Sequence, residues 1–289
     1  MAFDGESGVL MRIAVTGAGG RLGGQVVDLL AAEDDHDVVA VSRRKPPYER
    51  VTTMVADYAD PAALHAALRD VDTLVFVTSD GETAQLLMHH HNVIEAAVAG
   101  GVTHIVLLSS LDADLDSPFC YAVTGRYTEQ LLDGTECSVS IVRASIYTEF
   151  FMRWLTQART TGQIRLPAAD GRISLVSRTD VGRCLAALAL TPPTGRTHDL
   201  TGPESLDLPA IAAVAEQVWR IPIRYVDLTP AEYTVEMARA GEDPWWMYAF
   251  SSMFASVREQ RWTPTSGEVA RLTGRNPTPL RDILAHPIG

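Results

Sequence analysis

The sequence predicts an α/β fold, a doubly wound parallel sheet with a smaller, mostly helical C-terminal lobe. Its N-terminal half alternates short apolar runs, rich in β-branched residues, with stretches of helical periodicity. The runs are apolar throughout, which is typical of parallel strands covered by helices on both faces. The glycine-rich stretch TGAGGRLGG follows the first run, and the alternation stops after Arg143. Ligands of such folds bind at the carboxyl ends of the strands.

The individual elements follow one another regularly. Strands are expected at MRIAVTG, DVVAVS, VTTMVAD, DTLVFVTS, THIVLLSS and CSVSIVRAS. Helices are expected after the glycine-rich stretch and at 61–70, 82–99 and 121–132. Asp60 and Pro61 supply an N-cap and a first helical turn, and Gly100-Gly101 supplies a C-cap. From Thr229 onward the pattern is helical, with breaks expected at three prolines, Pro244, Pro264 and Pro277.

Composition limits the classes of function. The chain has 289 residues, of which 46% are hydrophobic, enough for a sizeable core. A net charge of −12 argues against nucleic acid as a partner. No apolar run reaches the length of a membrane span. The three cysteines lack paired spacing and are interpreted as free thiols in a reducing cytoplasm. We therefore expect a cytoplasmic monomer or homodimer acting on a small molecule.

The stretch from Thr16 predicts a dinucleotide site. Gly17, Gly20 and Gly23 form a G-x-x-G-x-x-G pattern between a strand and a helix, and Gly19 adds a further small residue. Such a turn lets the backbone approach a pyrophosphate, whose charge then lies at the helix N-terminus. Arg21 and Leu22 belong to the same expected site.

The end of the second strand indicates which dinucleotide is bound. It reads Ser42-Arg43-Arg44-Lys45, without the carboxylate that NAD sites use for the ribose hydroxyls. Arginine binds a phosphate through two parallel hydrogen bonds. We therefore predict NADP(H), with Arg43 as the main phosphate ligand; the alternative is a merely solvated basic turn. Further expected cofactor contacts are Asp57, Tyr58, Val77, Thr78, Ser79, Ser109, Ala144 and Ser145.

These motifs resemble those of an NmrA-like atypical short-chain dehydrogenase/reductase, in the quinone reductase and triphenylmethane reductase branch. The matching pieces are IAVTGAGGRLGG, ADYADPAAL, HNVIEAAVAGGVTHIVLLSS, SPFCYAVTGRYTE, VRASIYTEFF and ISLVSRTDVG. The resemblance implies a Rossmann domain that binds NADP(H), a small C-terminal lobe and a substrate cleft between them. The expected organisation is a disordered extension at 1–10, a Rossmann domain at 11–146 to which 173–192 return, and a substrate lobe at 147–172 and 193–289.

The resemblance also exposes a departure. In typical short-chain reductases a tyrosine protonates the nascent alkoxide, and a lysine four residues later lowers the pKa of that tyrosine. Tyr121 matches the tyrosine, and Ser109 or Ser110 lies near the usual serine, but the fourth residue on is Gly125. The chain's one lysine, Lys45, belongs to the second strand end. Tyr121 and Ser110 are nonetheless the candidate catalytic residues.

The missing lysine narrows the expected acceptors. Hydride transfer to a simple ketone makes an alkoxide, the conjugate base of an acid with a pKa of about 16. Hydride transfer to a quinone makes a phenolate-like anion, whose conjugate acid has a pKa of about 10. We therefore predict an NADPH-dependent reductase of quinones or phenol-bearing polycyclic ketones. A non-catalytic NADP(H) redox sensor fits the missing lysine equally well, and an epimerase or dehydratase on the same scaffold is a third reading.

Aromatic residues of the second half fit a flat substrate. Tyr147, Phe150 and Trp154 follow the sixth strand and are the expected substrate contacts, although core packing explains most aromatic residues of such a lobe. No metal site is expected. Consecutive histidines at 89–91 face different directions on a helix, and the aspartates at 112, 114 and 116 fit a solvated loop.

Overall fold

The computed structural model describes residues 11–33, 35–49 and 51–286, so the extension expected at 1–10 lies outside the described residues. Its centre is a seven-stranded sheet in the order β3-β2-β1-β4-β5-β6-β9, in which every pairing is parallel. The strands are β1 (Arg12–Val15), β2 (Asp37–Ser42), β3 (Thr52–Val55), β4 (Thr73–Phe76), β5 (His104–Ser110), β6 (Ser138–Ala144) and β9 (Thr197–Leu200). This confirms the predicted doubly wound Rossmann sheet.

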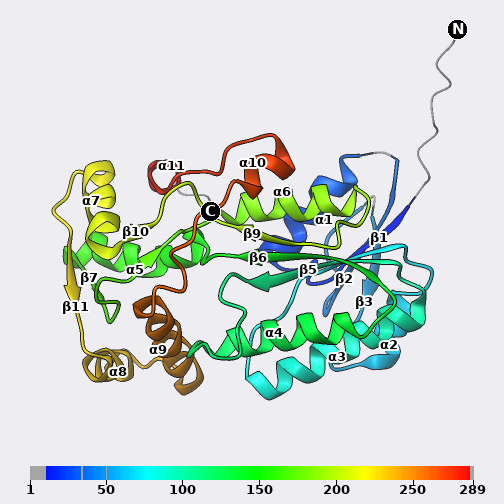
Figure 1. Ribbon diagram of the computed structural model, residues 1–289, viewed down its shortest axis with the longest axis horizontal. Coiled ribbons are helices and arrows are strands. Elements are labelled where there is room, and N and C mark those ends of the chain that lie inside the picture. Colours follow the sequence, from blue (N-terminus) through cyan, green and yellow to red (C-terminus); the bar gives the residue numbers. More distant parts are fainter. Residues whose placement is uncertain (1–10, 34, 50, 287–289) are drawn as a thin grey trace, which may run out of the picture.

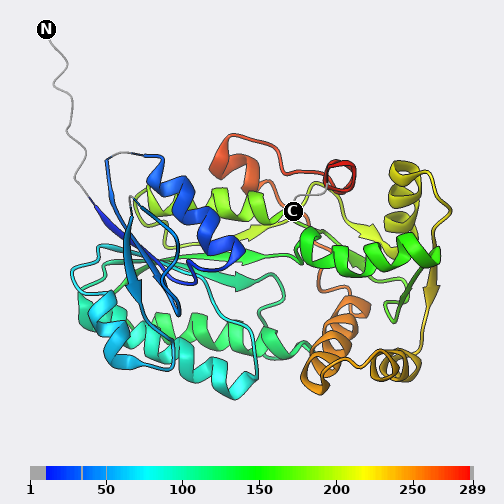
Figure 2. The ribbon, with the colours of Figure 1, turned by 180° about the vertical axis from the view of Figure 1, so that it is seen from behind.

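Helices cover both faces of the sheet (Figures 1 and 2). One face carries α1 (Arg21–Ala31) and α6 (Arg178–Ala189); the other carries α2 (Pro61–Ala67), α3 (Thr83–Gly100) and α4 (Cys120–Asp133). The chain runs from β1 outward to β3 and then returns across β1 to β4, so strand order reverses beside β1. That reversal opens a crevice at the carboxyl ends of the strands, where such folds bind ligands.

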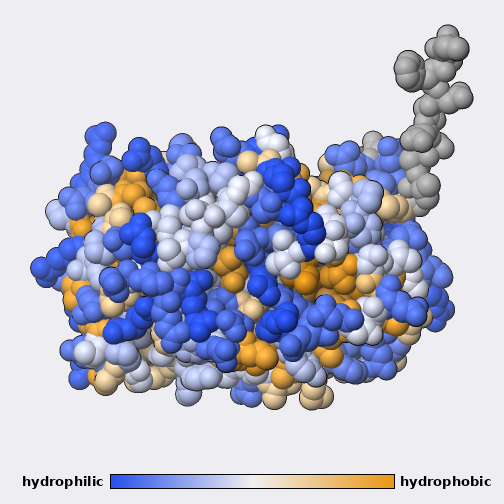
Figure 3. All heavy atoms as spheres, in the orientation of Figure 1, coloured by the Kyte–Doolittle hydropathy of each residue, from blue (hydrophilic) through white to orange (hydrophobic). Residues whose placement is uncertain are grey.

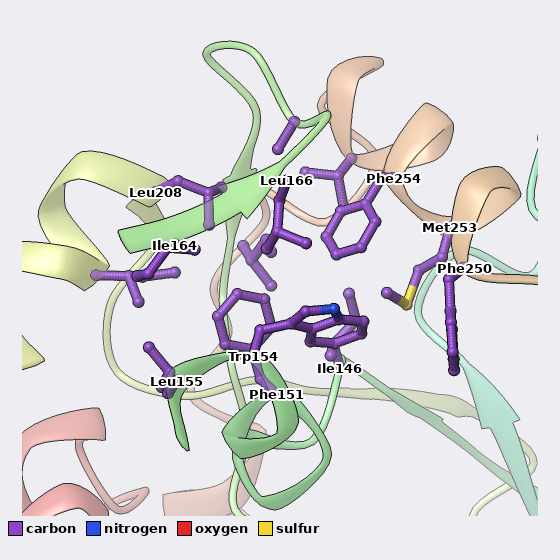
Figure 4. Close-up of a cluster of buried hydrophobic side chains, with 14 of the residues drawn as sticks. Ile146, Phe151, Trp154, Leu155, Ile164, Leu166, Leu208, Phe250, Met253 and Phe254 are labelled. Atoms are coloured by element: carbon purple, nitrogen blue, oxygen red, sulfur yellow. The ribbon is translucent and has the colours of Figure 1, made fainter. Parts of the chain in front are cut away.

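A smaller group of elements lies beyond this edge. It contains α5 (Thr148–Thr161), β7 (Gln163–Leu166), β8 (Arg172–Ile173), β10 (Leu206–Asp207), α7 (Leu208–Trp219), β11 (Arg224–Asp227), α8 (Pro230–Arg239), α9 (Pro244–Arg258) and α11 (Leu280–Ala285). Its core, shown in Figure 4, packs Phe151, Trp154 and Phe254 against aliphatic side chains. Strands β7 and β11 pair in parallel, and β8 and β10 pair antiparallel.

Two segments assigned to the smaller lobe from the sequence pack elsewhere. Strand β9 (Thr197–Leu200) pairs with β6 as the last strand of the main sheet, and α10 (Glu268–Thr273) places Val269 in the core beside α1 and α6. The sequence THDL does not indicate a buried strand because it contains a histidine. His198 is nevertheless buried, and its ring nitrogens are satisfied by contacts with Glu268 at 2.7 Å and Thr194 at 2.8 Å. Apolar periodicity does not reveal a strand buried in this way.

Helix ends follow the expected capping chemistry. Asp60 accepts a hydrogen bond from the Ala63 amide at 3.1 Å, and Gly101 ends α3 in the left-handed conformation, with φ +86°. The break expected at Pro244 separates α8 from α9, and Pro244 itself occupies the first turn of α9, capped by Asp243. In Figure 3, hydrophilic residues cover most of the face shown, and apolar ones form small separate patches. No helix within the described ranges is long and apolar enough to cross a membrane.

Candidate active site

One large cavity of about 1150 Å³ runs along the carboxyl edge of the sheet and ends against the smaller group of elements. Its wall begins at the glycine-rich turn and the end of β2, passes the ends of β4, β5 and β6, and finishes on α9. Of the residues predicted to bind cofactor or substrate or to act in catalysis, Thr16 and Trp154 are the two that do not line it.

The glycine-rich turn is tightly closed. Gly17 has φ +65°, and its carbonyl accepts a hydrogen bond from the Gly20 amide at 2.9 Å. A Cβ on Gly23 would lie 2.3 Å from the Gly17 carbonyl oxygen, so no other residue fits there without moving the backbone. Thr16 acts behind the turn, where its hydroxyl accepts a hydrogen bond from the Val77 amide at 3.1 Å. The turn is therefore fixed to β1 and β4 and opens onto the N-terminus of α1.

The end of β2 presents exposed cations to the cavity. Ser42 is buried, and its hydroxyl donates to the carbonyl of Arg44, which fixes the backbone of this basic turn. Arg43 and Arg44 are exposed and line the same cavity as the glycine turn. This arrangement places guanidinium groups beside the position where the adenosine ribose of a dinucleotide lies in such a fold.

Residues after β3 and β4, the strands on either side of β2 and β1, also line the cavity. The Tyr58 hydroxyl is buried and donates to the Val77 carbonyl at 2.6 Å, and burial raises the pKa of Tyr58. Asp57 lines the cavity while its carboxylate accepts from the Ala59 amide at 2.9 Å. Ser79 also lines it, and its hydroxyl oxygen is buried without a hydrogen-bond partner among the described residues. An orphaned hydroxyl of this kind can bind a polar ligand.

Tyr121 lies at the middle of the cavity wall. Its hydroxyl oxygen accepts hydrogen bonds from the Gly81 amide at 3.2 Å and the Trp245 indole at 3.3 Å. Phe119 packs edge-on against its ring, with 5.5 Å between centroids. Burial raises the pKa of Tyr121, and these two donors oppose that effect. The phenol therefore stays protonated at neutral pH and can donate a hydrogen bond or a proton.

Gly125 allows α4 to approach the end of β5. A Cβ there would lie 3.2 Å from the Ser109 hydroxyl, a tight contact. That hydroxyl donates to Glu129 at 2.7 Å, and Glu129, only 1% exposed, also binds Arg143 at 2.9 Å. The position that carries lysine in typical enzymes is thus packed against an anchored serine. Ser110 lines the cavity beside it and is half-buried.

The far end of the cavity is aromatic. Tyr147 and Phe150 come from the start of α5; the other contributors are Phe119, Trp246, Phe250, Met253 and Trp262. Burial raises the pKa of Tyr147, and the Arg178 guanidinium lies 5.6 Å from the centre of its ring. Trp154, expected at the substrate, instead supports this wall from within the core (Figure 4). Its ring centroid lies 5.4 Å from that of Phe150 and 5.6 Å from that of Phe250.

Several lining residues were not anticipated as ligand contacts. Among them are Arg178, which is an arginine away from the nucleotide motifs, and also His89, His90, Thr128 and the aromatic side chains of α9 and of the segment after it. A dense aromatic and methionine run at 245–254 was visible in the sequence, but the residues of that run that face the cavity could not be separated from those in the core. Ala144 and Ser145, at the end of β6, do line the cavity as expected.

The clusters considered for metal binding have other contacts. Arg261 pairs with Asp114 at 3.1 Å and with Asp112 at 3.6 Å, which ties the loop after β5 to the end of α9. The three histidines diverge, because His90 is buried, His91 is exposed and His89 lines the cavity. Within the described residues no group of three or more metal-ligating side chains comes together.

Comparison with known proteins identifies the family and the relatives of this chain. Residues 17–192 match the family model described as NAD(P)H-binding. An NmrA-like family domain-containing oxidoreductase of Aspergillus flavus is 27% identical over 95% of this chain and 94% of its own length. The structure of an NADPH-dependent quinone oxidoreductase from Escherichia coli, complexed with NADPH, is 27% identical, covers 95% of this chain and 99% of its own, and superposes with a TM-score of 0.88.

The triphenylmethane reductase of Citrobacter sp., complexed with NADP(H), shares the fold at 23% identity, with a TM-score of 0.87 over 96% of this chain and 100% of its own. The predicted resemblance is confirmed by the family match and by the NmrA-like and quinone oxidoreductase relatives. The chain belongs to the NAD(P)H-binding family, and an NmrA-like oxidoreductase is among the proteins that it resembles.

Proposed function

We propose that this protein is an NADPH-dependent reductase that transfers hydride to a quinone or a phenol-bearing polycyclic aromatic ketone. The observation that carries the proposal is the continuity of one cavity, from the guanidinium groups at the end of β2 to the aromatic side chains of α5 and α9. Dinucleotide and planar acceptor can then lie side by side in one space. The Escherichia coli relative, which is described as a quinone oxidoreductase and was crystallised with NADPH, supports it.

The chain's own residues fit NADPH. The turn at Gly17 and Gly23 is closed so tightly that no Cβ intrudes where a pyrophosphate approaches. Arg43, with Arg44 beside it, is suited to the ribose phosphate because a guanidinium binds phosphate oxygens through paired N–H groups. The Ser79 hydroxyl, which has no partner among the described residues, provides a further polar contact beyond β1, on the side opposite Arg43. NADPH, when bound, supplies the hydride, and the protein supplies position.

The acceptor end is suited to an anion that stabilises itself. The phenol of Tyr121 stays protonated, fixed by Gly81, Trp245 and Phe119, and can donate to the reduced oxygen. Its raised pKa makes it a weak acid. Such a donor suffices for a phenolate-like product, whose conjugate acid has a pKa of about 10, and is poorly matched to an alkoxide, at about 16. Orientation of acceptor against nicotinamide is then the main contribution to rate.

The aromatic wall favours planar acceptors. Phe150, Trp246 and Phe250 form one packed group, with centroids 5.9 Å apart for Phe150 and Phe250 and 5.5 Å for Trp246 and Phe250. Such groups hold a ring system by stacking and edge contacts. The guanidinium of Arg178 lies over the ring of Tyr147 and can attract the negative charge that develops on the acceptor.

Steady-state oxidation of NADPH tests the proposal. The purified protein is assayed with simple quinones, hydroxylated polycyclic quinones and ketones, and aliphatic ketones, and loss of nicotinamide absorbance is followed. We expect saturable turnover with the aromatic acceptors and little with the aliphatic ones. The reverse preference would overturn the assigned acceptor class. Tight NADPH binding without turnover of any acceptor would leave the redox-sensor role in its place.

A further inference from the structure

His90 is a buried histidine in the cavity wall that the proposed reaction does not use. It lies on α3, is 2% exposed, and packs edge-on against Phe76 with 5.4 Å between ring centroids. Its Nδ1 lies 2.6 Å from the hydroxyl oxygen of Thr128 on α4. The cavity that contains the glycine turn and Tyr121 reaches both residues.

The hydrogen bonds around Thr128 fix the tautomer of this histidine. The Thr128 hydroxyl has one hydrogen, which it donates to the Thr124 carbonyl at 2.7 Å. Its oxygen must therefore accept the short contact from His90, so Nδ1 carries the hydrogen. Burial, aided by neighbouring His89, lowers the pKa of His90 to about 4, so the ring is neutral at physiological pH. Nε2 is then a bare acceptor.

That acceptor has no hydrogen-bond partner in the part of the chain that the structure describes. Nε2 of His90 is buried and makes no hydrogen bond to any described residue. Buried polar atoms are almost always satisfied, and one that belongs to a residue lining a ligand cavity, as His90 does, can be satisfied by the ligand. Because Nε2 carries no hydrogen, it selects a donor rather than a phosphate or a carbonyl oxygen.

The order of the strands indicates which half of the cofactor lies near His90. Arg43 ends β2 on one side of β1, whereas His90 is bonded to α4, which follows β5 on the other side. A dinucleotide that places its ribose phosphate at Arg43 and its pyrophosphate at β1 extends its nicotinamide half toward β4 and β5. The hydrogen-bond donors of that half are the ribose hydroxyls and the carboxamide N–H group.

We propose that Nε2 of His90 accepts a hydrogen bond from the nicotinamide riboside half of the bound cofactor. This inference rests on the NADPH site of the proposed function. His90 is then a binding residue that fixes the nicotinamide end, as Arg43 fixes the adenosine end. Thr128 is a positioning residue that keeps the acceptor lone pair directed into the cavity.

Binding of two ligands to His90→Phe tests the proposal without needing an acceptor. The variant keeps a ring but removes both nitrogens. We expect the Kd for NADP⁺ to rise about three- to tenfold, the usual effect of one lost hydrogen bond, while adenosine 2′,5′-bisphosphate binds as to the wild type. His91→Phe, on the exposed neighbour, is the control and should bind both ligands normally. An unchanged Kd for NADP⁺, or equal losses for both ligands, would overturn the proposal.

A cofactor analogue separates the two donors. The 3-acetylpyridine analogue of NADP⁺ keeps the ribose but has no carboxamide N–H. If the ribose hydroxyl is the donor, the ratio of variant to wild-type Kd will be the same for NADP⁺ and the analogue. If the carboxamide is the donor, the substitution at His90 will not affect the analogue. Both results support the shared chemistry, and a loss for neither ligand contradicts it.

Nitrogen-15 NMR of the wild-type protein provides a measurement that does not depend on the folding of a variant. The His90 ring is assigned through bonds from its own backbone. We expect Nδ1 protonated and Nε2 unprotonated at neutral pH, and a shift of the Nε2 resonance toward lower frequency with NADP⁺ but not with adenosine 2′,5′-bisphosphate. Protonated Nε2, or an Nε2 resonance that NADP⁺ does not move, would refute the assignment. Neither readout depends on quinone turnover, so failure of the proposed reaction would appear separately.

Discussion

The two ends of the cavity are built in different ways. The nucleotide end is made by consecutive residues, the turn 16–23 and the strand end 42–44, and its shape comes from backbone geometry. The acceptor end is made by side chains from the loop after β5, the start of α5, and α9, which are far apart in sequence. At Gly23 of the nucleotide end an added Cβ would clash with the backbone, whereas we expect single substitutions at the acceptor end to change its preference.

The largest effect is expected where the backbone is tightest. Gly23→Ala places a Cβ 2.3 Å from the Gly17 carbonyl, so the turn must move. We expect loss of saturable NADPH binding and a free energy of unfolding lower by about 1–3 kcal/mol, measured by fluorescence titration and urea unfolding. Gly267→Ala is the control, because a Cβ there would meet nothing within 4 Å. Normal NADPH affinity in Gly23→Ala would show that the turn does not bind the pyrophosphate.

Charge at the same end should set the choice of cofactor. Arg43→Ala removes the guanidinium proposed to bind the ribose phosphate. We expect the Kd for NADPH to rise about 10- to 100-fold, with little change for NADH, because charge-assisted hydrogen bonds to the phosphate are lost. Arg69→Ala, at an exposed position outside the cavity, serves as the control. Equal losses for NADPH and NADH would remove the phosphate role.

A smaller effect is expected at the acceptor end. Tyr121→Phe removes one neutral donor, and kcat with quinones should fall only about two- to tenfold, because the product anion stabilises itself. Tyr127→Phe, on the exposed side of the same helix, should leave kcat unchanged. A near-total loss of quinone turnover in Tyr121→Phe would restore the tyrosine as an essential acid.

The smallest effect concerns pH. The pKa of Tyr121 is raised above its ordinary value of 10.0 by burial, so the protonated phenol persists to higher pH than in water. We expect kcat for quinone reduction to stay constant between about pH 6 and pH 9 and to fall only above about pH 10. Steady-state rates at saturating NADPH give this profile. A fall centred near pH 7 or 8 would indicate another ionising group at the acceptor end.

The same contrast explains what could be predicted from sequence. The strands of the first half, the glycine turn and the Arg43 strand end follow from local patterns, because each is built by neighbouring residues. Strand β9 does not follow from the sequence because His198, although buried, is polar and is satisfied by hydrogen bonds. Trp154 was assigned to the substrate because nothing local separates a core tryptophan from a lining one such as Trp246.

His90 was considered in the sequence only for metal binding, within a run of three histidines. What distinguishes it is the hydrogen bond to Thr128, 38 residues along the chain, which brings α3 and α4 together. Gly125 is a second residue whose surroundings could not be predicted from the sequence. The sequence establishes that lysine is absent, but only the packing of α4 against Ser109 shows that the helix approaches the strand end too closely for a Cβ to fit easily.

The central claim is that both ends act as one reductase site, and single-turnover mixing tests it most directly. Protein saturated with NADPH is mixed rapidly with a simple quinone, and the absorbance of the bound nicotinamide is followed against free NADPH with the same quinone. The account predicts a decay whose rate saturates with quinone concentration and exceeds that of free NADPH. Bound nicotinamide that persists unchanged while quinone is present would contradict it.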